Sequence, residues 1–205
     1  AYLNVPPFIS TMAMMEIVYG ICSIYTNATP LGGYVSEYTG LATGKFLGMS
    51  YLVWIALVVA AITWFIFNMT RHGKYMYAIG GNEQSALMMG LNVRRVKLKA
   101  YILDGFLCGV GSVLFCLNTL GGFVEQAKGF EMDAIASSVI GGTLLTGGVG
   151  NVFGTLFGVL IKATIEAFIT FQGTLSSWWT RITIAALLCF FIVLQSILAM
   201  VKKKK

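Results

Sequence analysis

Residues 49–67 read MSYLVWIALVVAAITWFIF, a stretch of apolar side chains without a single charge. An α-helix rises about 1.5 Å per residue and needs roughly 20 such residues to cross the hydrocarbon core of a membrane. Trp54 and Trp64 lie toward the two ends of the stretch, where amphipathic rings favour the headgroup region. This stretch therefore predicts a membrane-spanning helix.

The chain on either side of this stretch has the same character. Of its 205 residues, 57% are hydrophobic and only 11% are charged, whereas a soluble domain has about 25% charged residues. The apolar blocks are too long for the roughly ten-residue strands of a membrane barrel, and they do not alternate apolar with polar residues. The sequence thus predicts an all-α integral membrane protein. Its single transmembrane domain, residues 1–205, is expected to be a polytopic bundle of about six helices, with spans at residues 8–25, 49–67, 100–120, 133–148, 151–171 and 182–201.

Glycine marks two features of these spans. The fourth span is short and is interrupted by pairs of glycines. Gly150, Gly154 and Gly158 are spaced four residues apart, as are Gly105 and Gly109. Ladders of small residues let helix backbones approach closely in lipid, so we expect helices to pack along both ladders.

The positive charge is concentrated beside apolar blocks. Ten of the 14 basic residues lie in residues 71–99 and in the tail 202–205. This is the pattern of the positive-inside rule rather than of a nucleic-acid interface. We therefore expect the polar loop 68–97 and the C-terminus to face the cytoplasm. Four crossings must then separate the loop from the tail, so the short span 133–148 is expected to cross the membrane.

No group of residues resembles a catalytic or metal site. His72, the only histidine, lies in the basic loop, and the four cysteines lie far apart within apolar blocks. The nearest match to a nucleotide-binding loop, residues 40–46, is one residue short and lacks the hydroxyl that such a loop places on Mg²⁺. We expect no enzyme activity, no metal site and no cofactor bound by this chain. An ATPase that powers transport would be a separate polypeptide.

Ionisable side chains inside the spans are costly, and they are expected to pair with one another or to mark a pathway. Lys162 and Glu166 are four residues apart on one helix and can neutralise each other. Asp133 opens the glycine-rich span, where it either caps the first turn or lines a pathway. Glu16 and Asp104 have no partner nearby in sequence, so each faces a basic residue of another helix or a water-filled cavity. The candidate pathway residues are Glu16, Asp104, Asp133, Gly141, Gly142 and Glu166.

Residues 77–93 read YAIGGNEQSALMMGLNV and carry the sharpest local signals in the cytoplasmic loop. Asn82 is a good N-cap, Glu83 complements the positive end of a helix, and Gly90 is a good stop. Together they predict a helix of about two turns, which is marginal alone because nucleation is costly. The helix is therefore expected to dock, on a partner or in the lipid interface, through an apolar surface formed by residues 86–89.

This loop resembles the permease subunits of binding-protein-dependent sugar importers, the ribose, galactose and galactofuranose group of ATP-binding-cassette transporters. The shared signature is met by Thr70, Arg71, Gly73, residues 77–82, Ala86, Gly90 and Val93. A second similar stretch, residues 133–158, reads DAIASSVIGGTLLTGGVGNVFGTLFG, and its equivalent in the family is a glycine-rich span near the pathway. Residues 173–179, GTLSSWW, most resemble the galactofuranose-type permeases.

The resemblance implies a multi-pass permease subunit that imports a simple sugar across the bacterial cytoplasmic (inner) membrane. In this family the loop forms a coupling helix that seats on a separate ATPase subunit, which carries ATP and Mg. The residues that would make this contact here are Gly80, Gly81, Asn82, Glu83, Gln84, Ala86, Leu87 and Gly90. The other implied partners are a second permease chain, a periplasmic or lipoprotein sugar-binding protein and membrane lipid. Family members have more spans than this chain, so we expect it to be the C-terminal portion, lacking about four N-terminal helices.

Two other functions are compatible with these residues. In an ion- or proton-coupled secondary carrier, Glu16, Asp104 and Glu166 would relay the ion. A structural membrane subunit would have no substrate of its own. Uptake that is abolished by a protonophore but is indifferent to ATP would favour the carrier over the importer.

Overall fold

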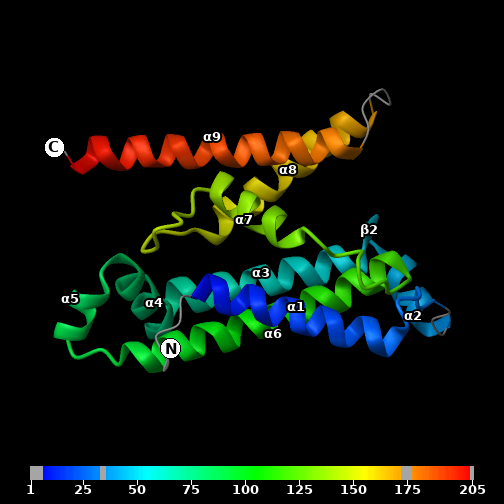
Figure 1. Cartoon of the computed structure of the whole chain (residues 1–205), viewed down its shortest axis with the longest axis horizontal. Coiled ribbons are helices and arrows are strands. Elements are labelled where there is room, and N and C mark those ends of the chain that lie inside the picture. The colour runs from blue at the N-terminus through cyan, green and yellow to red at the C-terminus, as the bar shows by residue number, and fades with distance from the viewer. Residues whose placement is uncertain (1–6, 33–35, 172–176, 204–205) are drawn as a thin grey trace. The chain divides into compact units, whose positions relative to one another are not determined.

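Helices account for most of the protein (Figure 1). The computed structural model describes residues 7–32, 36–171 and 177–203. The chain divides into two compact units, of which the first comprises Ala1–Ile62 and Gly90–Lys128 and the second comprises Thr63–Met89 and Gly129–Lys205. The all-α class predicted from the apolar blocks is confirmed.

Long apolar helices build the first unit. They are α1 (Pro7–Thr26), the first part of α3 (Tyr51–Met69) and α6 (Val93–Thr119). The short helix α2 (Ser36–Thr43) packs on α6, and strands β1 (Lys45–Phe46) and β2 (Met49–Ser50) form an antiparallel hairpin before α3. The Trp54 ring donates a hydrogen bond from Nε1 to the Phe46 carbonyl oxygen at 3.2 Å, which holds the hairpin against the start of α3.

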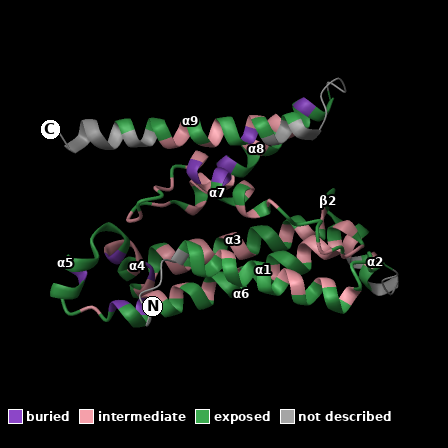
Figure 2. Cartoon of the chain, viewed as in Figure 1, coloured by how far each residue is buried: buried purple, intermediate pink, exposed green. Residues whose placement is uncertain are grey.

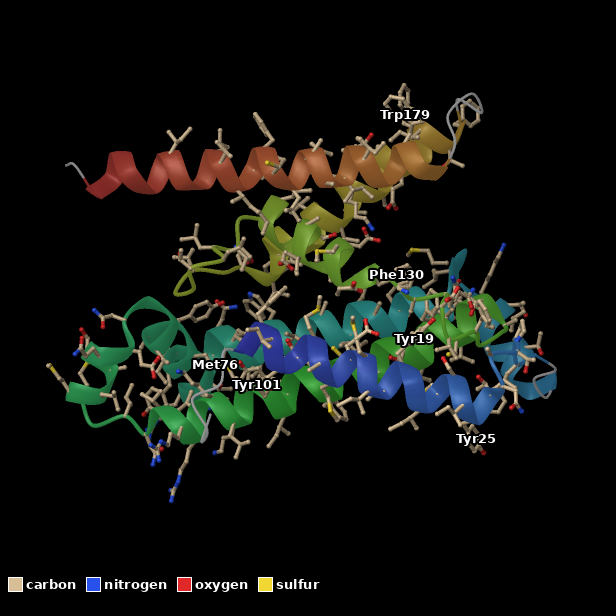
Figure 3. The ribbon with its side chains drawn as sticks, viewed as in Figure 1. Tyr19, Tyr25, Met76, Tyr101, Phe130 and Trp179 are labelled. Carbon is tan, nitrogen blue, oxygen red and sulfur yellow. The ribbon has the colours of Figure 1, made fainter. Side chains whose placement is uncertain are left out.

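The connection that follows α6 is tied back to α1 within the first unit. The Tyr19 hydroxyl donates a hydrogen bond to Glu125 Oε1 at 2.8 Å, and Lys128 Nζ lies 5.3 Å from the centre of the Tyr19 ring. Figure 3 shows Tyr19 on α1 beside this connection. An isolated bridge between Leu31 and Gly122 adds two backbone hydrogen bonds, of 2.8 and 2.9 Å. The connection is therefore held by Tyr19 within α1 and by Leu31 in the residues that follow α1.

Four helices in the described part of the chain are long and apolar enough to cross a membrane: Phe8–Thr26, Tyr51–Met69, Val93–Thr119 and Val152–Phe171. They overlap the predicted spans 8–25, 49–67, 100–120 and 151–171. The most apolar windows of the first three have no buried residue (Figure 2). In these helices Ile24 and Phe106 are 81% and 68% exposed. Exposure on this scale suits lipid as the surrounding solvent, because water drives apolar side chains into a core.

Helix α6 begins earlier than its predicted span, at Val93 rather than at residue 100. Asn92 caps it, because Asn92 Oδ1 accepts a hydrogen bond from the Arg95 N–H at 3.1 Å. The first turns of α6 are basic, and long basic side chains can extend from a helix end toward the headgroups. Hydropathy detects only the apolar part of such a helix.

The second unit contains five helices in its described residues, besides the end of α3: α4 (Arg71–Gly81), α5 (Glu83–Met88), α7 (Phe130–Ile140), α8 (Val152–Phe171) and α9 (Ser177–Lys203). Helix α7 packs against both α8 and α9, and α8 packs against α9. Ala136 and Val139 of α7 are 0% and 1% exposed, so α7 supplies the best-buried surface of this unit (Figure 2). Helix α9 contains the predicted span 182–201. Residues 173–176 of the GTLSSWW motif lie outside the described residues.

The predicted span 133–148 is helical only in its first half. Helix α7 ends at Ile140, and in the turns that follow Gly142, Gly147 and Gly148 have φ angles of +90°, +89° and +77°. Glycine adopts such angles without steric cost, and an α-helix cannot continue through them. The 11 residues of α7 rise only about 16 Å, roughly half of the hydrocarbon core. The crossing of this segment and the count of six spans stay predictions.

Candidate coupling and pathway site

The first turn of helix α4 packs closely against the last turn of α3. Thr70 caps α4, because its Oγ1 accepts a hydrogen bond from the Gly73 N–H at 3.2 Å. A Cβ at Gly73 would overlap the carbonyl oxygens of Ile66 and Phe67. The Thr70 and Gly73 positions of the family signature therefore serve the sharp turn between the two helices.

Asn82 ends one helix and begins the next. Its backbone N–H donates to the Ala78 carbonyl oxygen at 3.1 Å, which closes α4. Its side-chain Oδ1 accepts from the Ser85 N–H at 3.0 Å, which caps α5. Gly90, with φ of +80°, follows the end of α5. The structure thus has a short helix, Glu83–Met88, at the place that the Asn82 and Gly90 signals predict.

The α5 segment exposes most of its apolar side chains. Leu87, Met88 and Met89 are 55%, 84% and 67% exposed, and we call these three residues the α5 tip. Glu83 and Gln84 are exposed as well. Ala86 was predicted to belong to the docking surface, and this is wrong, because it is 0% exposed. Ala86 lies on the buried side of this short helix. It therefore packs α5 against the rest of the protein and does not form part of the exposed surface.

The last residues of α4 contact the glycine-rich loop 141–151 backbone to backbone. A Cβ at Gly80 would stand 2.7 Å from the Gly148 nitrogen, and a Cβ at Gly148 would stand 2.7 Å from the Gly81 Cα. Real Cβ atoms essentially never approach so closely. Beside this contact the Tyr77 hydroxyl donates a hydrogen bond to the Gly150 carbonyl oxygen at 2.9 Å. Two long-range interactions therefore fasten α4 to the loop.

Helices α7 and α8 also meet backbone to backbone. A Cβ at Gly141 would overlap the Gly154 carbonyl, and a Cβ at Gly158 would overlap the Ser137 carbonyl oxygen. The predicted ladder of small residues on α8 is confirmed at Gly154 and Gly158. Gly141, predicted as a pathway residue, lies in this helix contact, and a Cβ at the neighbouring Gly142 would have nothing within 4 Å.

A charged triad joins α7 to α8. Lys162 Nζ lies 3.1 Å from Glu166 Oε1 and 3.2 Å from Asp133 Oδ2. The pairing of Lys162 with Glu166 is confirmed. The side chains are 16% exposed for Lys162, 29% for Asp133 and 34% for Glu166, so all three are partly accessible. With two carboxylates and one ammonium, the ionised triad keeps one negative charge and free acceptor lone pairs.

Asp133 does not cap α7, contrary to one of the two predicted roles. The helix begins earlier, at Phe130, with Gly129 at the N-cap and no side-chain cap hydrogen bond. Glu131 Oε2 accepts from the Gly129 N–H at 3.1 Å instead. Asp133 is therefore free to reach Lys162, a partner that sequence spacing did not reveal.

The other two predicted pathway acids, Glu16 and Asp104, belong to the first unit. Glu16 on α1 and Asp104 on α6 are both exposed, and neither makes an ion pair or hydrogen bond within the described residues. A Cβ at Gly105 or Gly109 would have nothing within 4 Å. The predicted packing of α6 along these two glycines is therefore not observed among the residues that the structure describes.

A cavity of about 220 Å³ lies between α2 and α6 in the first unit. Its lining is Tyr38, Ser112, Val113, Cys116, Leu117 and Leu120. Sugar sites need several well-placed polar groups, and this lining is almost entirely apolar. We therefore do not assign the cavity to a sugar.

The amino-acid sequence is similar to known permeases over nearly its whole length. The model of a family described as "Branched-chain amino acid transport system / permease component" matches residues 1–192. The chain is 41% identical over 197 residues to the inner membrane ABC transporter permease protein YjfF of Escherichia coli K12, with 94% of this chain and 60% of the relative covered. No solved structure gives a match.

Two further relatives are named for the sugars that they import. The galactose/methyl galactoside import permease protein MglC of Salmonella typhimurium is 38% identical over 205 residues, with 96% of this chain and 60% of the relative covered. The ribose import permease protein RbsC of Escherichia coli K12 is 33% identical over 197 residues, with 94% and 61% covered. The chain thus spans about 60% of the length of these relatives.

Proposed function

Because the chain belongs to the branched-chain amino acid transport system / permease component family, we propose that it forms part of the permease subunit of an ATP-binding-cassette importer. The resemblance to the ribose and galactose group is confirmed by the relatives YjfF, MglC and RbsC. The names of these relatives favour an ABC permease over an ion-coupled carrier as the function of this chain. The names of MglC and RbsC also favour a simple sugar over the amino acids in the family description.

The observation that carries this proposal is the exposed α5 tip. Its three apolar side chains stand at the end of a helix pair that is fixed by caps and by the Gly80–Gly148 contact. Burying one such side chain against a partner yields about 1.5–3 kcal/mol. The proposed partner is a separate ATPase subunit that binds ATP and Mg. The polar residues Glu83 and Gln84 would flank the contact.

The contacts of the second unit support a cytoplasmic C-terminus. The Tyr77–Gly150 hydrogen bond places the start of α8 at the end of the unit where α4 and α5 lie. Helix α8 leads away from that end, and α9 packs along α8 and returns toward it (Figure 1). Since basic loops face the cytoplasm, the C-terminus lies there too in this proposal. The protein would be a multi-pass component of the inner membrane.

We place the charged triad on the sugar pathway near the middle of the membrane. Lys162 follows Val152, the first residue of α8, by ten positions, which corresponds to about 15 Å and to half of the hydrocarbon core. The lone pairs of Asp133 and Glu166 that Lys162 does not engage can accept hydrogen bonds from sugar hydroxyls. Gly142 would leave open space beside α7. Glu16 and Asp104, which belong to the first unit, stay proposed pathway residues.

The import mechanism in this proposal is a change between two packings of the bundle. A periplasmic or lipoprotein sugar-binding protein would deliver sugar to a pair of permease chains from outside. ATP-driven closure of the ATPase subunits would pull the α5 tips and favour one packing over the other. Such a mechanism needs differential binding of the partners and no covalent chemistry on this chain.

Reconstitution of the importer tests the proposal. The full permease, its ATPase and its sugar-binding protein are placed in proteoliposomes, and uptake of labelled galactose and ribose is measured. We expect uptake of one of the two sugars. This uptake should require ATP on the side of the membrane that corresponds to the cytoplasm, and it should resist a protonophore. Uptake that ignores ATP and stops with the protonophore would instead identify an ion-coupled carrier.

A further inference from the structure

At Gly80, the last turn of α4 and the glycine-rich loop meet through backbone atoms. The Gly80 Cβ position lies 2.7 Å from the Gly148 nitrogen, and the Gly147 Cβ position lies 2.7 Å from the Gly80 carbonyl oxygen. Gly147 and Gly148 also have positive φ angles, which side-chain-bearing residues rarely adopt. The loop is therefore shaped to bring its backbone against the last turn of α4.

Similar backbone contacts continue from this loop into the helices that carry the charged triad. Gly141 meets Gly154 where α7 ends, and Ser137 meets Gly158 further along α8. The Asp133–Lys162 ion pair follows in the same direction, at 3.2 Å. The Trp64 and Phe153 rings, with centroids 5.6 Å apart, add a contact between the end of α3 and the start of α8.

A contact between backbones transmits displacement differently from a contact between side chains. A side chain can absorb a shift by changing its rotamer, and closely packed backbone cannot. A movement of α4 must therefore move residues 147–148, unless the contact separates. Since the Tyr77 hydroxyl also holds Gly150, the loop has two attachments to the same helix.

From this geometry we propose that Gly80 and Gly148 form the joint through which the α4–α5 pair moves α7 and α8 during transport. The two glycines are positioning residues in this proposal, because they act through the contact between their own segments. The inference rests on the proposed importer function. In this proposal the contact between Gly80 and Gly148 transmits the movement of the ATPase-bound α4–α5 pair to the helices that carry the charged triad.

Two glycine-to-alanine substitutions test the joint in the assembled importer. Gly80→Ala places a methyl group 2.7 Å from the Gly148 nitrogen, whereas Gly109→Ala, the control on α6, meets nothing within 4 Å. Alanine is a better helix former than glycine, so neither change weakens the helix that carries it. The readouts are the amount of assembled complex, the ATP hydrolysis rate and the sugar molecules imported per ATP hydrolysed.

We expect both variants to assemble with the ATPase. Sugar imported per ATP falls by about tenfold in Gly80→Ala, which corresponds to about 1.4 kcal/mol between the two packings. The same ratio stays within about twofold of wild type in Gly109→Ala. A normal ratio of sugar to ATP in Gly80→Ala would overturn the proposal. An equal fall of this ratio in both variants would overturn it as well. A merely structural defect would lower the amount of complex without changing the ratio per assembled complex.

Tyr77→Phe provides a second test that adds no volume. It removes the hydrogen bond to Gly150 and is expected to lower the sugar imported per ATP in the same direction. If Gly80→Ala fails to assemble and Tyr77→Phe couples normally, the joint is rejected. A wild-type complex that needs no ATP, or that binds no ATPase, would reject the importer function itself, which is a separate result.

Discussion

Lys162 is the cation of the charged triad in the second unit. It bridges two carboxylates from different helices at 3.1 and 3.2 Å. Charges inside a span are tolerated when they are paired, and removing one partner leaves the others uncompensated. The same residue therefore stabilises the α7–α8 contact and sets the local negative charge that a sugar hydroxyl would meet.

Lys162→Met is expected to destabilise the protein by about 3 kcal/mol, because Asp133 and Glu166 then repel each other without a cation. Thermal unfolding in detergent measures this loss. Lys45→Met is the matched control, since Lys45 is an exposed lysine of the short strand β1, and its effect should stay within about 0.5 kcal/mol. Adding Asp133→Asn and Glu166→Gln to Lys162→Met should recover most of the stability. An unchanged unfolding temperature in Lys162→Met would contradict this role.

Met88 and Ala86 should respond to arginine in opposite ways. Met88 is 84% exposed and Ala86 is 0% exposed, so only Ala86→Arg forces a charged side chain into a packed site. We expect Met88→Arg to keep its unfolding temperature and to bind the ATPase subunit at least about tenfold more weakly. Ala86→Arg should lower the unfolding temperature of the protein itself, whether or not the ATPase subunit is bound. Undiminished ATPase binding by Met88→Arg would show that the α5 tip is not the docking surface.

At the scale of elements, α7 and α8 form the most closely packed pair in the second unit. Their backbones meet at Gly141 with Gly154 and at Ser137 with Gly158. Helix α6 offers a contrast in the first unit, because Gly105 and Gly109 are equally spaced and have nothing within 4 Å of their Cβ positions. Spacing alone therefore does not decide which glycine ladder is used.

Gly158→Ala should destabilise the protein by about 1–3 kcal/mol, because the new methyl group has to displace the Ser137 carbonyl or the whole of α7. Gly105→Ala should be neutral or stabilising, since helix propensity favours alanine and the space is open. Unfolding in a denaturing detergent compares the two variants. Equal behaviour of both would contradict the backbone contact between α7 and α8.

Short-range sequence patterns predicted helices and their ends well. They did not predict contacts between residues that are far apart in the sequence. The short helix α5 was predictable because Asn82 and Gly90 act on their immediate neighbours. The Lys162–Glu166 pair was predictable from its four-residue spacing. Asp133 as a third member, Ala86 as a buried residue and the Gly80–Gly148 contact depend on tertiary packing, which spacing along one helix does not contain.

At the scale of the whole chain, composition predicted the class and left the topology open. Long apolar blocks with little charge require helices in lipid, and four described helices have the necessary length and hydropathy. Helix α7 differs, because glycines with positive φ end it after 11 residues. Hydropathy averages over such a segment and cannot tell a short helix followed by a structured loop from a continuous span.

The orientation of the α5 tip is the point on which the importer proposal depends most directly. A single cysteine is introduced as Met88→Cys after Cys22, Cys108, Cys116 and Cys189 are replaced by alanine, and a membrane-impermeant maleimide is applied to oriented vesicles. The account predicts labelling in inside-out vesicles only, with protection when the ATPase subunit is bound. Labelling in right-side-out vesicles would place the α5 tip on the outer face of the membrane, where a cytoplasmic ATPase cannot reach it.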